Sequence, residues 1–383
     1  MERTTTTIPG AVRLQGRFVF LDGLRAVAAV SVMLFHFFNH WVSPIHDRLA
    51  EILPKATQVF LEHADLGVEV FFVLSGFVIA HSLFGKTITP RYVGSFILRR
   101  SLRLDPPYWV MIAMSLALPC VLFPADAQDF FAKFGGTTGV LVNMFYLPDL
   151  LWQPRIVGVA WTLCLEVQFY LAFLCLLAMT QSARAVFGGR YRWVSSAFAA
   201  ALFAGLLAFS VHRWMSLGKN DFSGRWFMFF TGVMLYWTVA GRIDWKVFGG
   251  YLAVILGLSI GFREPRSATV LGATLAIYAS AMTGGLRTWL GESAIQYFGR
   301  ISYSLYLVHM TAGVATINLI MHFGNESTAV VLFALVAAAG VSIGLADLLN
   351  RFVEMPAMRL SKGFKLAIKP APVEIPVVCT SLA

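Results

Sequence analysis

Residues 19–41, VFLDGLRAVAAVSVMLFHFFNHW, decide the fold class of this chain. The stretch is mostly apolar and long enough to cross a bilayer, so it predicts a membrane-spanning helix. It nevertheless contains Asp22, Arg25 and His36. Because ionisable side chains are costly inside a membrane, those that occur there are functional candidates.

The spacing of Arg25 and His36 fits a common role. On an α-helix their separation corresponds to a rotation of about 1100°, which brings them to one face, and to a distance of roughly 16 Å along that face. In a simpler interpretation, Arg25 pairs with Asp22 and His36 reaches the membrane interface. Both interpretations stay open at this point.

The composition excludes an ordinary soluble domain. The 383 residues are 58% hydrophobic and 13% charged, with a mean hydropathy of +0.71, whereas soluble domains are about 45–50% apolar. The length leaves room for about ten spans of roughly 20 residues and for no sizeable soluble domain. The first apolar run is too long for a cleaved signal peptide and is expected to stay as the first span. The spacing of the four cysteines suggests neither disulfides nor a metal site.

We therefore predict an all-α polytopic membrane protein with about ten transmembrane helices. A shorter run at 138–151 contains Pro148 and is expected to be an interfacial or re-entrant segment. Residues 1–18 and 351–383 are expected to be terminal tails, the second of them basic, around a transmembrane domain at 19–350. The expected spans are 19–41, 67–85, 104–123, 157–179, 193–211, 226–240, 247–262, 268–284, 301–322 and 328–350.

Lysine and arginine indicate the orientation. If the N-terminus is inside, the inner segments contain 20 of the 30 Lys and Arg, and the outer loops contain nine. Since basic residues favour the cytoplasmic side, both termini are predicted to be cytoplasmic. This bias accounts for most of the formal charge of +10 and gives no indication of nucleic-acid binding.

Five motifs in order resemble the membrane acyltransferase-3 family. They are LDGLRAVAAVSVMLFHF (21–37), GVEVFFVLSGFVIAHSLF (67–84), FILRRSLRLDPPYW (96–109), WTLCLEVQFYL (161–171) and ISYSLYLVHM (301–310). Members of this family are polytopic proteins of the bacterial inner membrane. They move acyl groups, usually acetyl, from coenzyme A donors onto sugars and other acceptors.

The resemblance implies roles for several polar residues near the outer face. His36 would be the general base, and Glu69, where the family usually carries Asp, would hold its ring. Alternatively, Glu69 only provides a favourable negative charge at a helix N-terminus. Ser75 and Gly76 are expected mainly to allow close helix packing.

The donor is expected to bind on the inner side. Arg99, Arg100 and Arg103 match the family motif and suit the phosphates of acyl-CoA, because arginine offers planar paired donors. Topology signals and anionic lipids would explain the same basic residues. Arg25 would hold the pyrophosphate or polarise the thioester. Glu354 is expected to pair with one of the inner arginines.

Two further spans contribute polar residues. Glu166 lies near mid-membrane and is a further catalytic candidate; it needs a partner, for which His309 is a candidate. Ser302, Tyr306 and His309 form one polar stripe at helical spacing and are expected to contact the donor. A purely structural network of Glu166, Tyr306 and His309 stays an equal alternative.

The sequence thus predicts a membrane O-acyltransferase, most often an O-acetyltransferase in this family. It would take acyl-CoA, with acetyl-CoA the expected donor in view of that preference, on the cytoplasmic side and acylate a hydroxyl of a carbohydrate or glycan at the outer face. No metal is expected; membrane lipids are the other partners, and a homo-oligomer stays open. The alternatives are a small-molecule or lipid-linked acceptor, a covalent acyl-enzyme, or a transporter, although no internal repeat supports the last.

Overall fold

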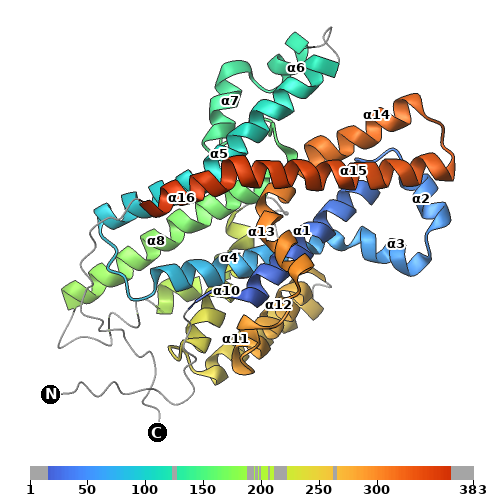
Figure 1. Ribbon diagram of the computed structural model, residues 1–383. Coiled ribbons are helices and arrows are strands. Elements are labelled where there is room, and N and C mark those ends of the chain that lie inside the picture. Colours follow the sequence, from blue (N-terminus) through green and yellow to red (C-terminus); the bar gives the residue numbers. More distant parts are fainter. Residues whose placement is uncertain are drawn as a thin grey trace.

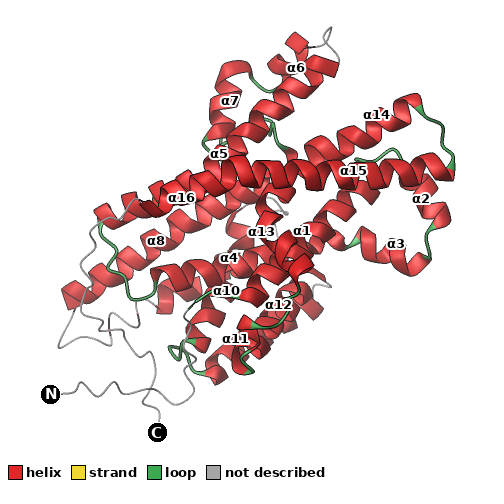
Figure 2. Cartoon of the chain, viewed as in Figure 1, coloured by secondary structure: helices red, strands yellow, loops and turns green. Residues whose placement is uncertain are grey.

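The computed structural model describes residues 16–122, 127–187, 222–261 and 265–363, together with parts of 194–210. Within these residues the regular structure is helical throughout (Figure 2). Six helical stretches are long and apolar enough to cross a membrane. The all-α multi-pass class is therefore confirmed. The six stretches are Val19–Phe38, Lys55–Leu83, Pro90–Val121, Gly158–Val186, Ser293–Phe323 and Thr328–Gly363.

The helices are arranged as Figure 1 shows. In chain order, the α-helices are α1 Val19–Phe38, α2 His46–Ile52, α3 Lys55–Glu62, α4 Gly67–Leu83, α5 Pro90–Leu122, α6 Ala127–Lys133, α7 Gly136–Met144, α8 Trp161–Phe187, α10 Phe222–Val239, α11 Trp245–Gly261, α12 Pro265–Met282, α13 Ser293–Val308, α14 Ala315–Phe323, α15 Thr328–Leu349 and α16 Met355–Gly363. Short 3₁₀ helices are η1 Ala64–Leu66, η3 Gly158–Ala160 and η4 Gly285–Arg287, and π-helical turns are η5 His309–Val314 and η6 Asn350–Glu354.

The apolar runs of the sequence coincide with these helices, except that the run at 193–211 lies largely outside the described residues. Helices α10, α11 and α12 are present but are not among the six long apolar stretches. The number of ten spans therefore stays a prediction.

Helix α1 lies inside the bundle, where it packs along α13 and against α4 (Figure 1). Its end is set at Asn39, whose backbone is extended. The ring of His46 donates from Nδ1 to the Phe38 carbonyl at 2.5 Å, which satisfies one of the last carbonyl groups of the helix. The helix thus keeps Arg25 and His36 on one continuous α-helical segment.

Glycines bring α4 and α10 into backbone contact. A Cβ atom on Gly76 would lie 1.9 Å from the Phe229 carbonyl oxygen, and one on Gly232 would lie 2.0 Å from the Val73 carbonyl oxygen. No side chain fits at either position. The packing role expected for Gly76 is therefore confirmed.

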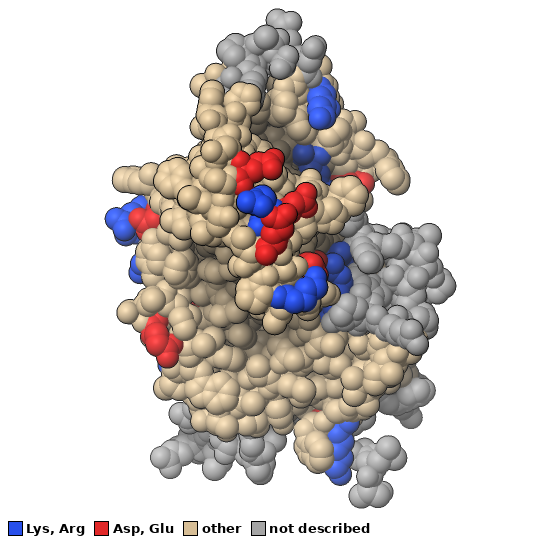
Figure 3. Space-filling view, turned by 90° about the vertical axis from the view of Figure 1, so that its right-hand side faces the viewer, with Lys and Arg blue, Asp and Glu red and all other residues tan. Residues whose placement is uncertain are grey.

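One end of the bundle carries mixed charges. Helices α2 and α3 lie there, with α2 beside the turn between α14 and α15 (Figure 1). Arg48 of α2 pairs with Glu51 and donates from Nε to the Glu326 carbonyl at 2.9 Å, which connects α2 to that turn. In the space-filling view of this end, acidic and basic side chains lie close together on a mostly uncharged surface (Figure 3).

The segment at 138–151 forms α7 and a following turn, which project with α6 from the bundle (Figure 1). Tyr146 has a φ of 62°, an unusual backbone conformation for a bulky residue. Its ring stacks on Tyr108 at 5.0 Å, and its hydroxyl donates to Asp105 Oδ1 at 2.8 Å. Burial raises the pKa of Tyr146, so the phenol stays protonated and keeps this bond.

Replacing the contact glycines should loosen the bundle. We expect Gly76→Ala and Gly232→Ala to destabilise the purified protein by at least ~1–3 kcal/mol, because each methyl group meets backbone atoms that cannot yield. Gly94→Ala and Gly250→Ala, which would meet nothing within 4 Å, are the controls. Thermal unfolding in detergent measures the difference, and equal melting temperatures in all four variants would contradict the assigned contact.

Candidate active site

A cavity of about 300 Å³ lies among α1, α4, α5, α8 and α13. Its charged lining is dominated by arginine, which is opposed by two carboxylates. Such a cavity inside a membrane bundle favours an anionic ligand, because the excess positive charge is otherwise costly to bury. The charged lining residues are Arg17, Asp22, Arg25, Arg100, Arg103 and Glu166.

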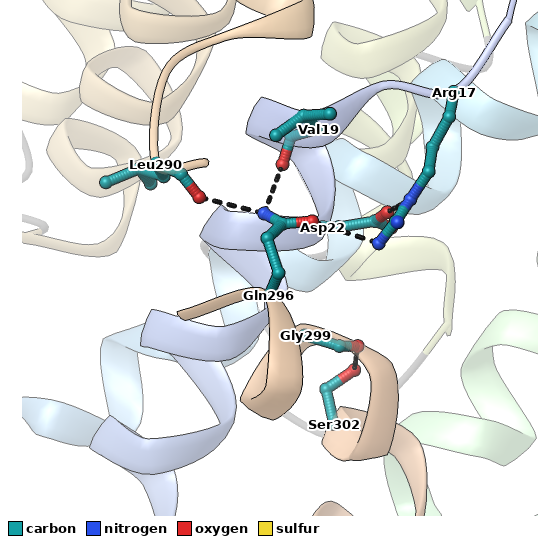
Figure 4. A network of polar contacts seen from close by, with 7 residues as sticks. All are labelled: Arg17, Val19, Asp22, Leu290, Gln296, Gly299 and Ser302. Atoms are coloured by element: carbon teal, nitrogen blue, oxygen red, sulfur yellow. Dashed lines mark hydrogen bonds and ion pairs between the residues drawn. The ribbon is translucent and has the colours of Figure 1, made fainter. Parts of the chain in front are cut away.

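The start of α1 forms one edge of this cavity and is fixed to α13 (Figure 4). Arg17 pairs with Asp22 at 2.7 Å and donates from Nη2 to Gln296 Oε1 at 2.9 Å. Gln296 donates in turn to the carbonyls of Val19 and Leu290. Asp22 is thus paired with Arg17, and the simpler interpretation in which it pairs with Arg25 is wrong.

Glu166 faces the cavity and is held by neighbouring hydroxyl groups. It accepts hydrogen bonds from Ser75 Oγ at 2.8 Å and from the Tyr170 hydroxyl. Arg100 donates to the same Tyr170 hydroxyl at 2.9 Å and stacks over its ring. His309 is not a partner of Glu166, so the pairing expected from the sequence is wrong; α4 and α8 supply the nearer partners Ser75 and Tyr170.

Two of the three predicted donor arginines line the cavity. Arg100, Arg103 and Leu104 line it from α5, and on a helix they span an arc of about 100°. Arg99 falls outside that arc and is not a lining residue.

Tyr306 also lines the cavity, four residues after Ser302 on α13. The Thr162 hydroxyl donates to its phenol oxygen at 3.0 Å, and this oxygen lies 3.3 Å from the Val159 carbonyl, to which it donates. Ser302 also lines the cavity and donates to the Gly299 carbonyl at 2.9 Å. The predicted stripe therefore divides, because Ser302 and Tyr306 line the cavity whereas His309 lies beyond Tyr306.

His309 contacts His36 rather than the cavity. His309 Nε2 lies 3.1 Å from His36 Nδ1, and the two ring centres are 5.0 Å apart. The Tyr306 ring lies 5.7 Å from the His309 ring. Tyr306 on α13 therefore contacts both the cavity and His309, the first residue of η5, and His309 contacts His36.

Glu69 does not hold the His36 ring, so that prediction is wrong. It is fully buried and accepts from Arg266 Nη1 at 2.7 Å, with Arg225 Nη1 at 3.6 Å. Arg266 also pairs with Asp65 at 2.7 Å. Two arginines from α10 and α12 draw the carboxylate away from α1, because a buried carboxylate needs cationic partners. Glu69 lies in the first turn of α4, as the helix-terminus alternative required.

Glu354 also has other partners than expected. It is buried and accepts from Ser304 Oγ at 2.7 Å and from Asn350 Nδ2 at 2.8 Å. Among the described residues, Glu354 forms no close ion pair with an inner arginine, because the π turn η6 brings Asn350 within reach and α13 supplies Ser304; its charge nevertheless acts on Arg103. Among the described residues, no group of His, Cys, Asp and Glu could hold a metal ion.

Several site residues gave little signal in the sequence. Thr162 lies four residues before Glu166 and therefore on the same helix face, which could have indicated it. Ser75 was expected to serve packing, and only the structure brings it to Glu166. Arg225 and Arg266 stand out as charges close to apolar runs, but nothing local connects them to Glu69.

The fold and the cavity define a multi-pass membrane protein with an internal, arginine-rich site. The chain belongs to the acyltransferase-3 family, because the family model, described as an acyltransferase domain, matches residues 18–347. The protein is therefore an acyltransferase that transfers groups other than amino-acyl groups.

Curated relatives support this membership at different lengths. The exopolysaccharide production protein ExoZ of Rhizobium meliloti is 28% identical over 78% of this chain and 90% of its own length. The peptidoglycan O-acetyltransferase OatA of Listeria monocytogenes is 27% identical over 39% of this chain, but over only 22% of its own length. A regulator of hypoxia-inducible factor 1 from Caenorhabditis elegans is 31% identical over 39% of this chain and 32% of its own length. No solved structure gives a significant match.

The two ion pairs of Arg266, with Glu69 and with Asp65, should contribute differently to the stability of the protein. We expect Arg266→Ala to destabilise the protein by about 3–5 kcal/mol, because it removes the near partner of a fully buried carboxylate. Asp65→Asn, on the partly exposed side of the same guanidinium, should cost only about 0–1 kcal/mol. Thermal unfolding of both purified variants tests this order, which a larger loss in the Asp65 variant would reverse.

Proposed function

We propose that the protein is an integral membrane O-acetyltransferase that moves an acetyl group from acetyl-CoA on the cytoplasmic side to a hydroxyl of a carbohydrate or glycan at the outer face. The observation that carries this proposal is the arginine-rich cavity lined by Tyr306, whose ring contacts His309, which in turn contacts His36. Its relatives support the acetyl group and the glycan acceptor, because OatA is named for peptidoglycan O-acetylation and ExoZ for exopolysaccharide production.

The donor would be held by charge and shape. Arg17, Arg100 and Arg103 offer donors for the phosphates of coenzyme A, and Arg17 is well exposed at the cavity edge. The pantetheine arm would run past Arg25 and Ser302 toward Tyr306. Arg25 would hold the pyrophosphate or stabilise charge that develops on the thioester carbonyl. The roughly 16 Å between Arg25 and His36 fits such an extended arm.

The reaction would need one base. His36 would take the proton of the acceptor hydroxyl, and the resulting alkoxide oxygen would attack the thioester carbonyl. The carbon–sulfur bond then breaks, and the leaving thiolate takes up the proton from His36. Glu166 and the Ser75 and Tyr170 hydroxyls would keep Arg100 in place beside the arm.

The topology proposed with this function has about ten spans, with both termini in the cytoplasm of a bacterial cell and the bundle in its inner membrane. Its support is the excess of Lys and Arg in the segments assigned to the inside. The mixed charge of the α2–α3 end, in contrast, suits an outer face.

Removing the side chain of His36 or Arg25 should strongly reduce transfer. We expect His36→Ala and Arg25→Ala to lower acetyl transfer by at least about 10²-fold, the usual contribution of general base catalysis or of a positioned charge. The assay supplies [¹⁴C]acetyl-CoA to membrane vesicles and measures alkali-labile acetate in their glycan fraction. His63→Ala and Arg359→Ala, at exposed positions, are the matched controls.

The two outcomes have different meanings. Loss in both variants at equal membrane levels supports the site on α1. Full activity of His36→Ala would remove the proposed base, and transfer that does not depend on added acetyl-CoA would remove the proposed donor.

The orientation can be tested separately. In a chain whose own cysteines are replaced, we expect a cysteine at Lys55 to react with a membrane-impermeant maleimide on intact spheroplasts. A cysteine at Lys86, an equally exposed position, should react only after the membrane is opened. The reverse pattern would overturn the proposed orientation.

A further inference from the structure

The four ring nitrogens of His36 and His309 have distinct surroundings. His36 Nδ1 lies 2.9 Å from the Val32 carbonyl oxygen and 3.1 Å from His309 Nε2. His309 Nδ1 lies 3.1 Å from the Leu305 carbonyl oxygen. In both residues the carbonyl belongs to the residue four positions earlier on the same helical segment.

These contacts indicate which ring nitrogen of each histidine carries the proton. A carbonyl oxygen can only accept, so a hydrogen bond to it requires a proton on the facing nitrogen. Both neutral rings therefore carry their proton on Nδ1. His309 Nε2 is then an acceptor, and it shares the single Nδ1–H of His36 with the Val32 carbonyl in a three-centre hydrogen bond. The remaining nitrogen of His36, Nε2, keeps its lone pair and is the basic atom of the ring.

The backbone around His309 is built to make this contact. His309 is fully buried and is the first residue of the π turn η5. A Cβ atom on Gly313, in the same turn, would lie 2.5 Å from the Phe37 ring next to His36. The absence of a side chain at Gly313 thus lets the turn approach α1 at this point. π-helical turns of this kind are frequent at functional sites.

A neutral hydrogen-bond acceptor suits the position next to Nδ1 of His36. A carboxylate commonly holds the corresponding nitrogen of a basic histidine, but a carboxylate buried here would itself need a cationic partner. Among the described residues, Asp65 of η1 is the charged group that acts on His36, and His36 itself acts on His309. Glu69 and Glu166, the carboxylates expected nearby, are bound elsewhere.

We propose that His309 is a positioning residue for His36, a role that rests on the proposed function of His36 as the base. His309 accepts the Nδ1–H of His36 and so directs Nε2 of His36 to the acceptor hydroxyl. When Nε2 takes the proton of that hydroxyl, His36 becomes an imidazolium, and its bond to His309 becomes charge-assisted and stronger. The proton stays on His36 until the leaving thiolate takes it, and His309 changes no bond of its own.

Substitutions at His309 test its role as a hydrogen-bond acceptor for His36. A glutamine side chain offers an oxygen near the position of Nε2, whereas leucine has a similar size and no acceptor, so the variants are His309→Gln and His309→Leu. With the vesicle assay and [¹⁴C]acetyl-CoA, we expect His309→Leu to lower kcat by about 10²-fold with an unchanged KM for acetyl-CoA. His309→Gln should recover at least a tenth of the wild-type kcat.

A matched control distinguishes loss of the contact with His36 from a general effect of replacing a histidine. His63 also bonds to a carbonyl four residues earlier, Val59 O at 2.8 Å, but it is exposed and faces no second histidine. His63→Leu should therefore keep wild-type activity. Equal loss in His309→Gln and His309→Leu, or full activity in His309→Leu, would overturn the positioning role.

A second measurement does not depend on activity. In ¹⁵N-histidine NMR of the wild-type protein in detergent, with signals assigned through His36→Ala and His309→Gln, both rings should show the Nδ1–H form. An Nε2–H form of His36 would overturn the proposal. Activity that persists in His36→Ala would instead overturn the proposed function, while the NMR result would still report on the pair.

Discussion

The close contact of α1 with α13 is the constraint on which the site depends. A helix that carries Arg25 and His36 can remain in a membrane only if its polar face is covered by other helices or faces a wet cavity. The backbones meet where Gly299 leaves room, since a Cβ atom there would lie 2.4 Å from the Asp22 carbonyl oxygen. Further along, Ala29 and Ile301 are both completely buried. This contact places Ser302 and Tyr306 beside the cavity and His309 beside His36.

Two groups of charged side chains lie around this contact, and they differ in net charge. In the cavity, arginines outnumber carboxylates, so the protein holds an excess of positive charge that a ligand can neutralise. Around Glu69, by contrast, Arg266 and Arg225 face Asp65 and Glu69, and the charges compensate one another within the protein. The first arrangement suits binding, and the second suits a permanent connection between α4, α10 and α12.

The sequence predicted what lies within one helix better than what lies between helices. The membrane-spanning length of 19–41, the stripe on 301–310 and the role of Gly76 follow from local sequence. The partners of Glu69 and Glu166 do not. Glu69 meets Arg266, which lies 197 residues away, and the choice between Arg266 and His36 depends on how each helix is rotated about its axis. Helical spacing shows which residues share a face, but it does not show toward which neighbouring helix that face points.

Hydroxyl groups show the same limit, because Ser75 and Thr162 are small polar residues of a kind that commonly serves packing in membrane helices. Their bonds to Glu166 and Tyr306 become visible only when the depth of two helices is known together.

The π turn at His309–Val314 separates two halves of one long helix. Because it contains a residue more than an α-helical turn accommodates, the faces of α13 and α14 are offset by about 100°, the angle of one residue. The face that α13 presents to the cavity therefore does not continue along α14. Helical spacing counted forward from Ser302 and Tyr306 therefore identifies the wrong face of the helix beyond Val314.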